Sequence, residues 1–338
     1  MIIIILAVIF AFSVLIIAHE LGHFLAARRA GIRVHEFSIG MGPLVKAWKR
    51  GETVYSLRAL PLGGFNRMAG MEPGDADDPR GFNRQPVYSR MAVIASGSGM
   101  NFLAAIVLYV VIYMIMGVPS PDPVVGRVMP GKPADVAGIQ VGDVIKEVGA
   151  RPVRTWSELV AAIHAWEGRS LPVKVERGKE TLLLYVKPEI DETTGKPFIG
   201  IEQKLEKYSL CSSVYLGFLQ TLKLTVFIIR SLVDIVLGVA PPEVAGPVGI
   251  VHVIGEAARF GFLNLLSITA LLSLNLGLIN LFPIPSLDGS RMVFLIVEAV
   301  RKRPLDPEKE NMVHFLGFVL LMALMVIITY KDIIRIFG

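Results

Sequence analysis

Uncharged stretches long enough to cross a bilayer dominate this sequence. The first eighteen residues (MIIIILAVIFAFSVLIIA) carry no charge, and neither do residues 91–119 or 260–287. Residues 311–330 are interrupted only by His314. A helix needs about 20 apolar residues to span the hydrocarbon core of a membrane. Together with a hydrophobic content of 53%, these stretches predict a polytopic α-helical membrane protein with about four transmembrane helices.

Residues 214–239 are apolar enough to span a membrane, yet Lys223, Arg230 and Asp234 interrupt them. The spacings of 7 and 4 residues place these three charges along one stripe of a helix. One polar stripe on an otherwise apolar helix is typical of an element that lies in the membrane interface. We therefore expect an interfacial helix here, and a fifth span lined by a salt bridge is the alternative.

Positive charge is concentrated in two loops. Eleven lysines and arginines lie within residues 19–90, and four more lie within residues 301–309. Loops rich in lysine and arginine stay on the cytoplasmic side of a membrane. This places the N-terminus, residues 122–208 and the short C-terminal tail outside the cytoplasm. The same bias accounts for the net charge of +5 without a nucleic acid partner, and the single Cys211 excludes an internal disulfide.

The pattern of charge and hydropathy divides the chain into three parts. Residues 1–121 form an N-terminal membrane part, and residues 209–338 form a C-terminal membrane part. Residues 122–208 between them have an ordinary soluble composition. Within them a predicted strand, a Pro-Gly turn, a short helix and the segment VGARPV precede a helix at TWSELVAAI. This order predicts a small β-rich domain inserted between membrane helices.

The sequence HELGH at residues 19–23 places two histidines and a glutamate at the end of the first apolar stretch. On a helix, residues four apart lie about 40° from each other around the axis, so His19 and His23 can bind one zinc ion. Glu20 lies about 100° from His19, which suits a general base that acts on a zinc-bound water. An incidental pair of interfacial histidines would leave Glu20 unexplained, because acidic side chains in spans are costly and usually functional.

A tetrahedral catalytic zinc needs a third protein ligand. The four other histidines lie in no recognisable ligand setting, whereas Asp288 ends the third apolar stretch in NLFPIPSLDGSR. Pro283 and Pro285 cannot sustain a regular helix, and broken backbone at membrane depth is tolerated where it lines a water-filled cavity. Taken alone, the segment is equally compatible with an ordinary helix end. Asp288 can meet the histidines only if residues 214–239 do not cross the membrane.

Together, HELGH in the first span and NLFPIPSLDG at the end of a later span resemble the site-2 protease family of intramembrane zinc metalloproteases. The bacterial regulator-of-sigma-E protease type, in a form with one PDZ domain, is the most similar pattern. The resemblance implies that His19, His23 and Asp288 bind Zn²⁺ and that Glu20 is the catalytic base. It further implies that Asn280 holds the substrate near the metal.

Other segments agree with this resemblance, which covers nearly the whole chain. PLGGF at residues 61–65, followed by NRMAG, resembles the family's membrane-associated β-region on the cytoplasmic side. An exposed edge there could pair with an extended substrate, and a plain hairpin packed on the bilayer is the alternative. AGPVGI at residues 245–250 also fits. ASGSGMNF at residues 95–102 departs from the usual Gly-Pro before Asn-Phe, without affecting a proposed ligand.

Residues 122–208 resemble a circularly permuted bacterial PDZ domain, and PDZ domains bind extended peptides by β-augmentation. The resemblance implies an extracytoplasmic domain that binds or filters the external parts of substrates. A purely structural role is the alternative.

The sequence therefore predicts a protease of the bacterial cytoplasmic (inner) membrane that cuts transmembrane segments of single-span substrates. The resemblance implies truncated anti-sigma factors or remnant signal peptides as substrates. A non-catalytic zinc-binding PDZ scaffold is the alternative, but a scaffold would not need Glu20. A transporter would carry ionisable residues across several spans, and residues 91–119 and 260–287 have none.

Overall fold

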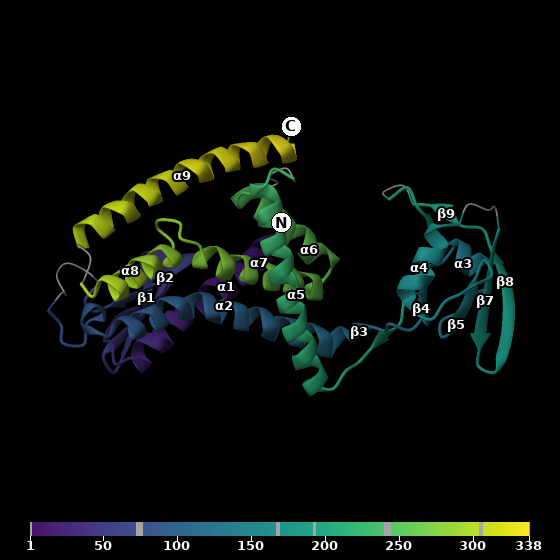
Figure 1. Cartoon of the computed structure of the whole chain (residues 1–338), viewed down its shortest axis with the longest axis horizontal. Helices are drawn as coiled ribbons and strands as arrows, with labels where there is room; N and C mark the ends of the chain where they lie inside the picture. The colour runs from purple at the N-terminus through teal and green to yellow at the C-terminus, as the bar shows by residue number, and fades with distance from the viewer. Residues whose placement is uncertain are drawn as a thin grey trace. The chain divides into compact units, whose positions relative to one another are not determined.

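Two units make up the structure, a computed structural model that describes residues 2–71, 77–166, 170–191, 194–239, 245–303 and 307–337. The first unit combines Met1–Ile112 with Ser212–Gly338, and the second consists of Tyr113–Cys211 (Figure 1). Long apolar helices dominate the first unit, and the second unit is the β-rich insertion expected from the sequence.

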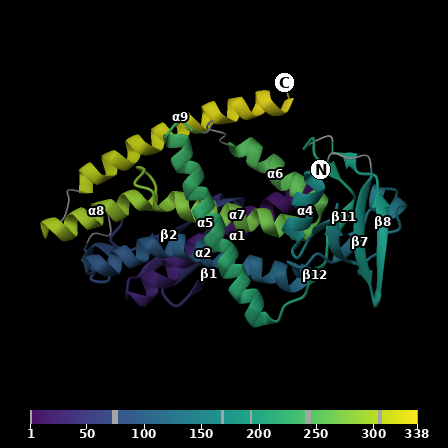
Figure 2. The ribbon, with the colours of Figure 1, turned by 45° about the vertical axis from the view of Figure 1, so that its right-hand side comes forward.

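Five helices are long and apolar enough to cross a membrane, one more than the approximately four that the sequence predicts. They are α1 (Ile2–Arg29), α2 (Val87–Met116), α5 (Leu210–Val236), α7 (Phe262–Leu281) and the Met312–Arg335 part of α9 (Pro307–Phe337). The additional helix is α5, which contains the three charges noted above. Figures 1 and 2 show α2 and α7 running lengthwise together, whereas α5 runs across them.

Helix α1 continues well past its charge-free stretch. The following residues include Leu, Ala and Arg, which are strong helix formers, so the helix extends to Arg29. It ends where Gly31 adopts a φ of 76°, a left-handed conformation that glycine tolerates without steric cost. The HELGH sequence therefore lies inside a regular helix, and the one-turn spacing of its histidines is preserved.

Helix α7 ends before its apolar stretch does. Phe282 is extended, as expected for a residue that precedes a proline, and the chain then passes through Pro283 and Pro285. Helix α8 (Asp288–Arg301) begins directly after this turn, and α6 (Pro247–Phe260) precedes α7. The proline-rich turn therefore places Asp288 at the first residue of a new helix.

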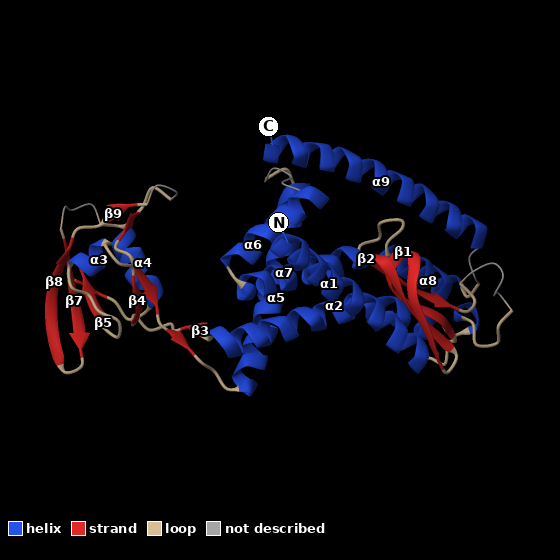
Figure 3. Cartoon of the chain, turned by 180° about the vertical axis from the view of Figure 1, so that it is seen from behind, coloured by secondary structure: helices blue, strands red, loops and turns tan. Residues whose placement is uncertain are grey.

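The β-region expected between the first two spans is a long antiparallel hairpin of β1 (Val34–Arg50) and β2 (Thr53–Met68). Figure 3 shows these as the long paired strands of the first unit. The hairpin is anchored on α1 by aromatic packing, because the Phe24 ring lies 5.1 Å from Phe37 and 5.9 Å from Tyr55. A short 3₁₀ turn at Phe82–Arg84 precedes α2.

The second unit is built on a four-stranded antiparallel sheet in the order β6-β5-β7-β8. Its strands are β5 (Val144–Val148), β6 (Arg151–Pro152), β7 (Leu171–Arg177) and β8 (Glu180–Val186). Shorter strands pair beside it: β3 (Val118–Pro119) with β12 (Leu205–Glu206), β4 (Val125–Val128) with β11 (Ile201–Gln203), and β9 (Glu189–Ile190) with β10 (Pro197–Phe198). The helices α3 (Pro133–Val136) and α4 (Trp156–His164) complete the unit, whose core includes Ile145, Leu159 and Val173.

One buried ion pair supports this unit. The Arg177 guanidinium donates two hydrogen bonds of 2.8 Å to the carboxylate of Asp143, and the Gln140 amide donates a third at 2.9 Å. Burial by itself would raise the pKa of Asp143, but Arg177 and the Gln140 amide hold that pKa below its ordinary value. Such a carboxylate stabilises the fold above its unfolded pKa of about 3.9, and the contribution is lost as pH falls through the folded pKa.

We expect Arg177→Met to lower the free energy of unfolding of the second unit at pH 7 by clearly more than an exposed-pair control, because the buried carboxylate of Asp143 loses its charged partner. The difference from wild type should shrink as pH falls and Asp143 is protonated. Denaturant unfolding followed by tryptophan fluorescence measures both effects. Arg127→Met, which removes an exposed pair with Glu202, is the matched control. Equal losses in the two variants would contradict the prediction.

Candidate active site

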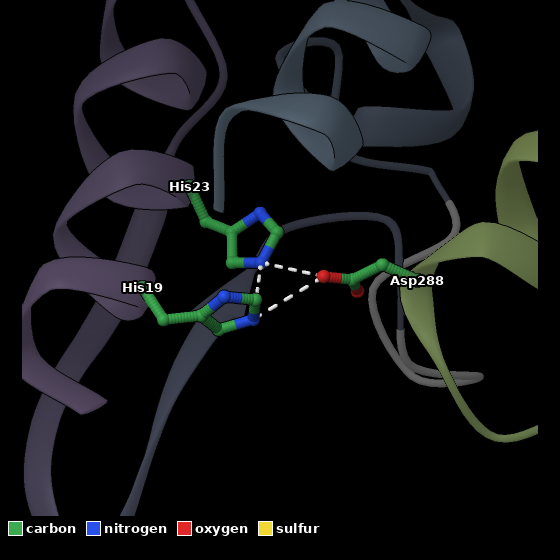
Figure 4. Close-up of side chains that lie close together, drawn as sticks. All are labelled: His19, His23 and Asp288. Carbon is green, nitrogen blue, oxygen red and sulfur yellow. Dashed lines mark hydrogen bonds and ion pairs between the residues drawn. The ribbon is translucent and has the colours of Figure 1, made fainter. Parts of the chain in front are cut away.

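His19 and His23 lie one helical turn apart on α1 and direct their imidazoles to the same point (Figure 4). Their Nε2 atoms are 3.2 Å apart, and each lies 3.2 Å from Oδ2 of Asp288. Among the described residues, this is the one group of His, Cys, Asp or Glu side chains placed to hold a metal ion. The structure therefore brings together three residues that the sequence separates by up to 269 positions, from 19 to 288.

This donor set fits zinc. A tetrahedral zinc ion with bonds of about 2.0–2.1 Å holds its ligand atoms about 3.3 Å from one another. The three atoms here are 3.2 Å apart in each pair. Two imidazoles and one carboxylate are also a ligand set of catalytic zinc sites that keep a fourth position open. The three side chains would therefore hold the ion with little rearrangement.

Asp288 is available as an anion. Burial by itself would raise the pKa of its carboxyl, but the imidazoles of His19 and His23 hold that pKa well below its ordinary value. A carboxylate binds a metal in its deprotonated form. The two imidazoles thus favour the form of Asp288 that a metal ligand requires.

Contacts from α2 orient both imidazoles. Nδ1 of His23 donates to the Val93 carbonyl at 2.9 Å, which leaves a lone pair on Nε2 for the metal. Nδ1 of His19 lies 3.3 Å from the side-chain nitrogen Nδ2 of Asn101, a residue that is fully buried. If His19 also presents the lone pair of Nε2 to the metal, its Nδ1 carries the proton and needs an acceptor. The side-chain oxygen Oδ1 of Asn101 lacks a hydrogen-bond partner among the described residues. Asn101 therefore accepts a hydrogen bond from His19 when its amide is turned so that Oδ1 takes the place of Nδ2.

The Asn101 contact was not predicted from the sequence. The sequence feature that could have indicated Asn101 is its polar amide within a charge-free stretch that is long enough to span a membrane.

Glycine in α2 makes room for the imidazoles. A β-carbon on Gly97 would lie 2.3 Å from Nε2 of His23 and 2.8 Å from Cε1 of His19. Atoms cannot approach so closely, so α2 packs against the histidines only with glycine at this position. Gly97 belongs to the small-residue segment ASGSGMNF, and this close contact places that segment against the two histidines.

The turn that carries Asp288 is held by α9. Ser286 adopts a φ of 80°, which is strained for a residue other than glycine, and its N–H lies 3.2 Å from the acceptor Nδ1 of His314. The sequence showed no ligand setting for His314, and the structure gives it this contact with the turn instead. His314 therefore positions the loop without joining the ligand group.

A cavity of about 310 Å³ opens beside these three candidate ligands. Glu20 lines it together with His19, His23 and Asp288, and further walls come from β2 and from the turn between α7 and α8. At about 30 Å³ per molecule in the liquid, the space admits several waters. Ligands, a carboxylate base and room for water in one cavity are what metal-assisted hydrolysis requires.

Asn280 lies apart from this cavity. It is buried near the end of α7, with 8% of its surface exposed, and it is not among the described residues that line the cavity. Its expected role in holding the substrate stays a prediction.

Helices that can cross a membrane, combined with a zinc ligand set beside a glutamate, define a membrane-embedded metallohydrolase. Comparison with known proteins identifies the family within this class. The model of peptidase family M50 matches residues 7–324, nearly the whole chain, and the protein belongs to this family.

Named relatives agree. The chain is 33% identical to the regulator of sigma-W protease RasP of Bacillus subtilis, over 98% of this chain and 99% of that protein. It is 35% identical to a putative zinc metalloprotease of Clostridium acetobutylicum, over 96% of both chains. The protein is thus a zinc-dependent, site-2-type membrane protease. A solved PDZ domain of an SdrC-like protein from Listeria monocytogenes is 25% identical over 25% of this chain and 90% of its own, with a TM-score of 0.23.

We expect Gly97→Ala to displace the imidazoles and to reduce the zinc bound per chain well below the wild-type value. Metal analysis of the purified protein measures this. Gly99→Ala is the matched control, because a β-carbon there meets nothing within 4 Å. Wild-type zinc content in both variants would refute the packing account of Gly97.

We also expect Asn101→Leu to weaken zinc binding about 10–100-fold, the usual effect of removing a partner that orients a metal-bound histidine. Competition with a chelator measures the affinity. Ser98→Ala, which changes a neighbouring buried polar side chain of α2, should keep the wild-type affinity. Unchanged zinc affinity in Asn101→Leu would show that His19 does not depend on this contact.

Proposed function

We propose that His19, His23 and Asp288 are the zinc ligands and that Glu20 is the general base for hydrolysis of peptide bonds within transmembrane segments. The observation that carries this proposal is the set of three ligand atoms spaced 3.2 Å apart in a cavity that Glu20 also lines. The cavity is lined by the C-terminal half of α1, a helix that is long and apolar enough to cross a membrane.

Each of these residues has one task. A zinc ion bound at this site supplies Lewis-acid polarisation and makes water more acidic. The Glu20 carboxylate accepts a proton from the attacking water and returns it to the leaving amine. His19 and His23 remain neutral and Asp288 remains anionic throughout, because each is needed as a ligand.

A transmembrane substrate must be extended locally before it is cut, because the backbone groups of a helix are hydrogen-bonded to one another and sterically shielded. The hairpin β1–β2 would hold the extended strand by main-chain hydrogen bonds, and β2 lines the cavity, which supports this placement. Asn280 would hold the substrate near the metal, as the family resemblance implies.

The substrates we propose are single-span membrane proteins. The Bacillus subtilis relative is named a regulator of sigma-W protease, which supports truncated anti-sigma factors, and remnant signal peptides are a second group. Residues 122–208 would act as a PDZ domain that binds or filters the external parts of substrates. A non-catalytic zinc-binding scaffold is the competing function, and Glu20 in the cavity argues against it.

We place the protein in the bacterial cytoplasmic membrane, with the β-rich unit on the extracytoplasmic side. The lysines and arginines of residues 19–90 and 301–309 support a cytoplasmic location for both loops. The meeting of His19 and Asp288 requires that α1 and α7 end on the same side of the membrane. This topology requires that α5 does not cross the membrane. Helix α5 lies across α2 and α7 rather than alongside them, which supports the requirement (Figure 2).

Glu20→Gln should keep bound zinc and lose cleavage, whereas His19→Ala and Asp288→Ala should lose both, because only the latter two remove ligands. Cleavage of a purified single-span test substrate in detergent and metal analysis of the same samples measure the two properties. Glu180→Gln, at an exposed strand position, should match wild type. Cleavage by Glu20→Gln at the wild-type rate would exclude Glu20 as the base.

A further inference from the structure

We propose that Asn66 of β2 is a positioning residue that holds the Glu20 carboxylate in place for its role as base. This inference rests on the catalytic role proposed for Glu20 above. The hairpin β1–β2 thereby takes part in the reaction itself, in addition to the substrate binding proposed for it above.

The contact uses the full donor capacity of the Asn66 amide. Nδ2 donates to Oε2 of Glu20 at 2.6 Å and to the main-chain carbonyl of Glu20 at 2.8 Å. The main-chain carbonyl can only accept, so this contact settles that the nitrogen end of the amide faces Glu20. Two hydrogen bonds from one group fix the direction of the carboxylate relative to its own helix.

The arrangement leaves the second carboxylate oxygen available. Within the described part of the chain, Glu20 Oε1 accepts no hydrogen bond. An amide that binds one oxygen and leaves the other free restrains the side chain without occupying the atom that must take up a proton. Because Asn66 and Glu20 both line the cavity, this restraint operates where the water must lie.

The backbone of β2 is built to come this close. A β-carbon on Gly64 would lie 3.0 Å from Cγ of Glu20 and 2.9 Å from the main-chain oxygen of Ser38 on β1. A side chain there would push the strand away from α1. Asn66 also pairs with Phe37, whose ring packs on Phe24 of α1, so the hairpin register fixes its height along the helix.

A purely structural role for Asn66 explains less. Its Oδ1 atom is buried and has no hydrogen-bond partner among the described residues, and an unpaired buried acceptor destabilises a fold. An apolar side chain of similar size, such as leucine, would avoid that cost. Among the described side chains, Glu20 accepts the hydrogen bond from this amide. A polar group that is costly to bury but contacts the proposed base is expected of a residue that serves the reaction.

Purified full-length Asn66→Leu, Asn66→Asp and Asn66→Gln test this role with a single-span substrate in detergent. We expect Asn66→Leu to lower kcat roughly 10–100-fold, a part of the usual contribution of a general base, with KM within about two-fold of wild type. Zinc content and thermal stability should stay at wild-type values. Asn66→Asp should lower kcat at least as much, because it places a second carboxylate against Glu20, and Asn66→Gln should recover part of the rate.

Asn264→Leu is the matched control, because that asparagine donates only to the main-chain carbonyl of Phe260 one turn away on an exposed surface. It should leave kcat unchanged. If Asn66→Leu does not fold, the comparison of Asn66→Asp with Asn66→Gln decides, since the positioning role requires Asp to be the slower of the two.

Two results separate this inference from the proposed function. Wild-type kcat in Asn66→Leu and Asn66→Asp, with Glu20→Gln inactive, would overturn the positioning role and leave the assignment of Glu20 intact. Wild-type cleavage by Glu20→Gln would overturn both. A fall in kcat that accompanies an equal loss of zinc or of thermal stability would assign Asn66 a structural role instead and overturn the inference.

Discussion

A cluster of ionisable side chains at the end of an apolar helix is the constraint on which the rest of this structure depends. In surroundings without water, such groups are costly unless each is hydrogen-bonded, paired with an opposite charge or bound to a metal. Each member of the cluster has such a partner here: His19 pairs with Asp288, His23 donates to the Val93 carbonyl, and Glu20 accepts from the amide of Asn66. The partners come from α2, α8 and β2, so the cluster exists only when these elements pack together.

That packing explains several features that would otherwise be unrelated. Helix α2 approaches the imidazoles because Gly97 has no side chain, and it supplies Asn101 beside His19. The prolines that end α7 bring Asp288 back toward α1, and His314 of α9 holds the strained turn before it. These contacts act on the direction of the ligands, which is what sets the affinity and geometry of a metal site.

The cavity beside His19, His23 and Asp288 is built by one of the two units. Every described residue that lines the cavity belongs to the first unit. The second unit has its own hydrophobic core and its own ion pair, between Arg177 and the buried carboxylate of Asp143.

The sequence by itself determined what depends on short-range pattern. Hydropathy over about 20 residues indicated the spans, and the four-residue spacing in HELGH placed His19 and His23 on one helix face. The proline-broken segment before Asp288, taken together with HELGH, made Asp288 the expected third ligand. The helix α5 was expected in the interface, yet its length and apolarity also suit a span, because composition alone does not set the direction of a helix.

Only the tertiary structure decided the contacts of Asn66, Gly97, Asn101 and His314. Asn66 is 46 residues from Glu20, and Asn101 is 82 residues from His19. No periodicity within one element connects residues so far apart. Their roles arise where separate helices and a strand are forced together around buried polar groups, and that convergence is a property of the packed fold.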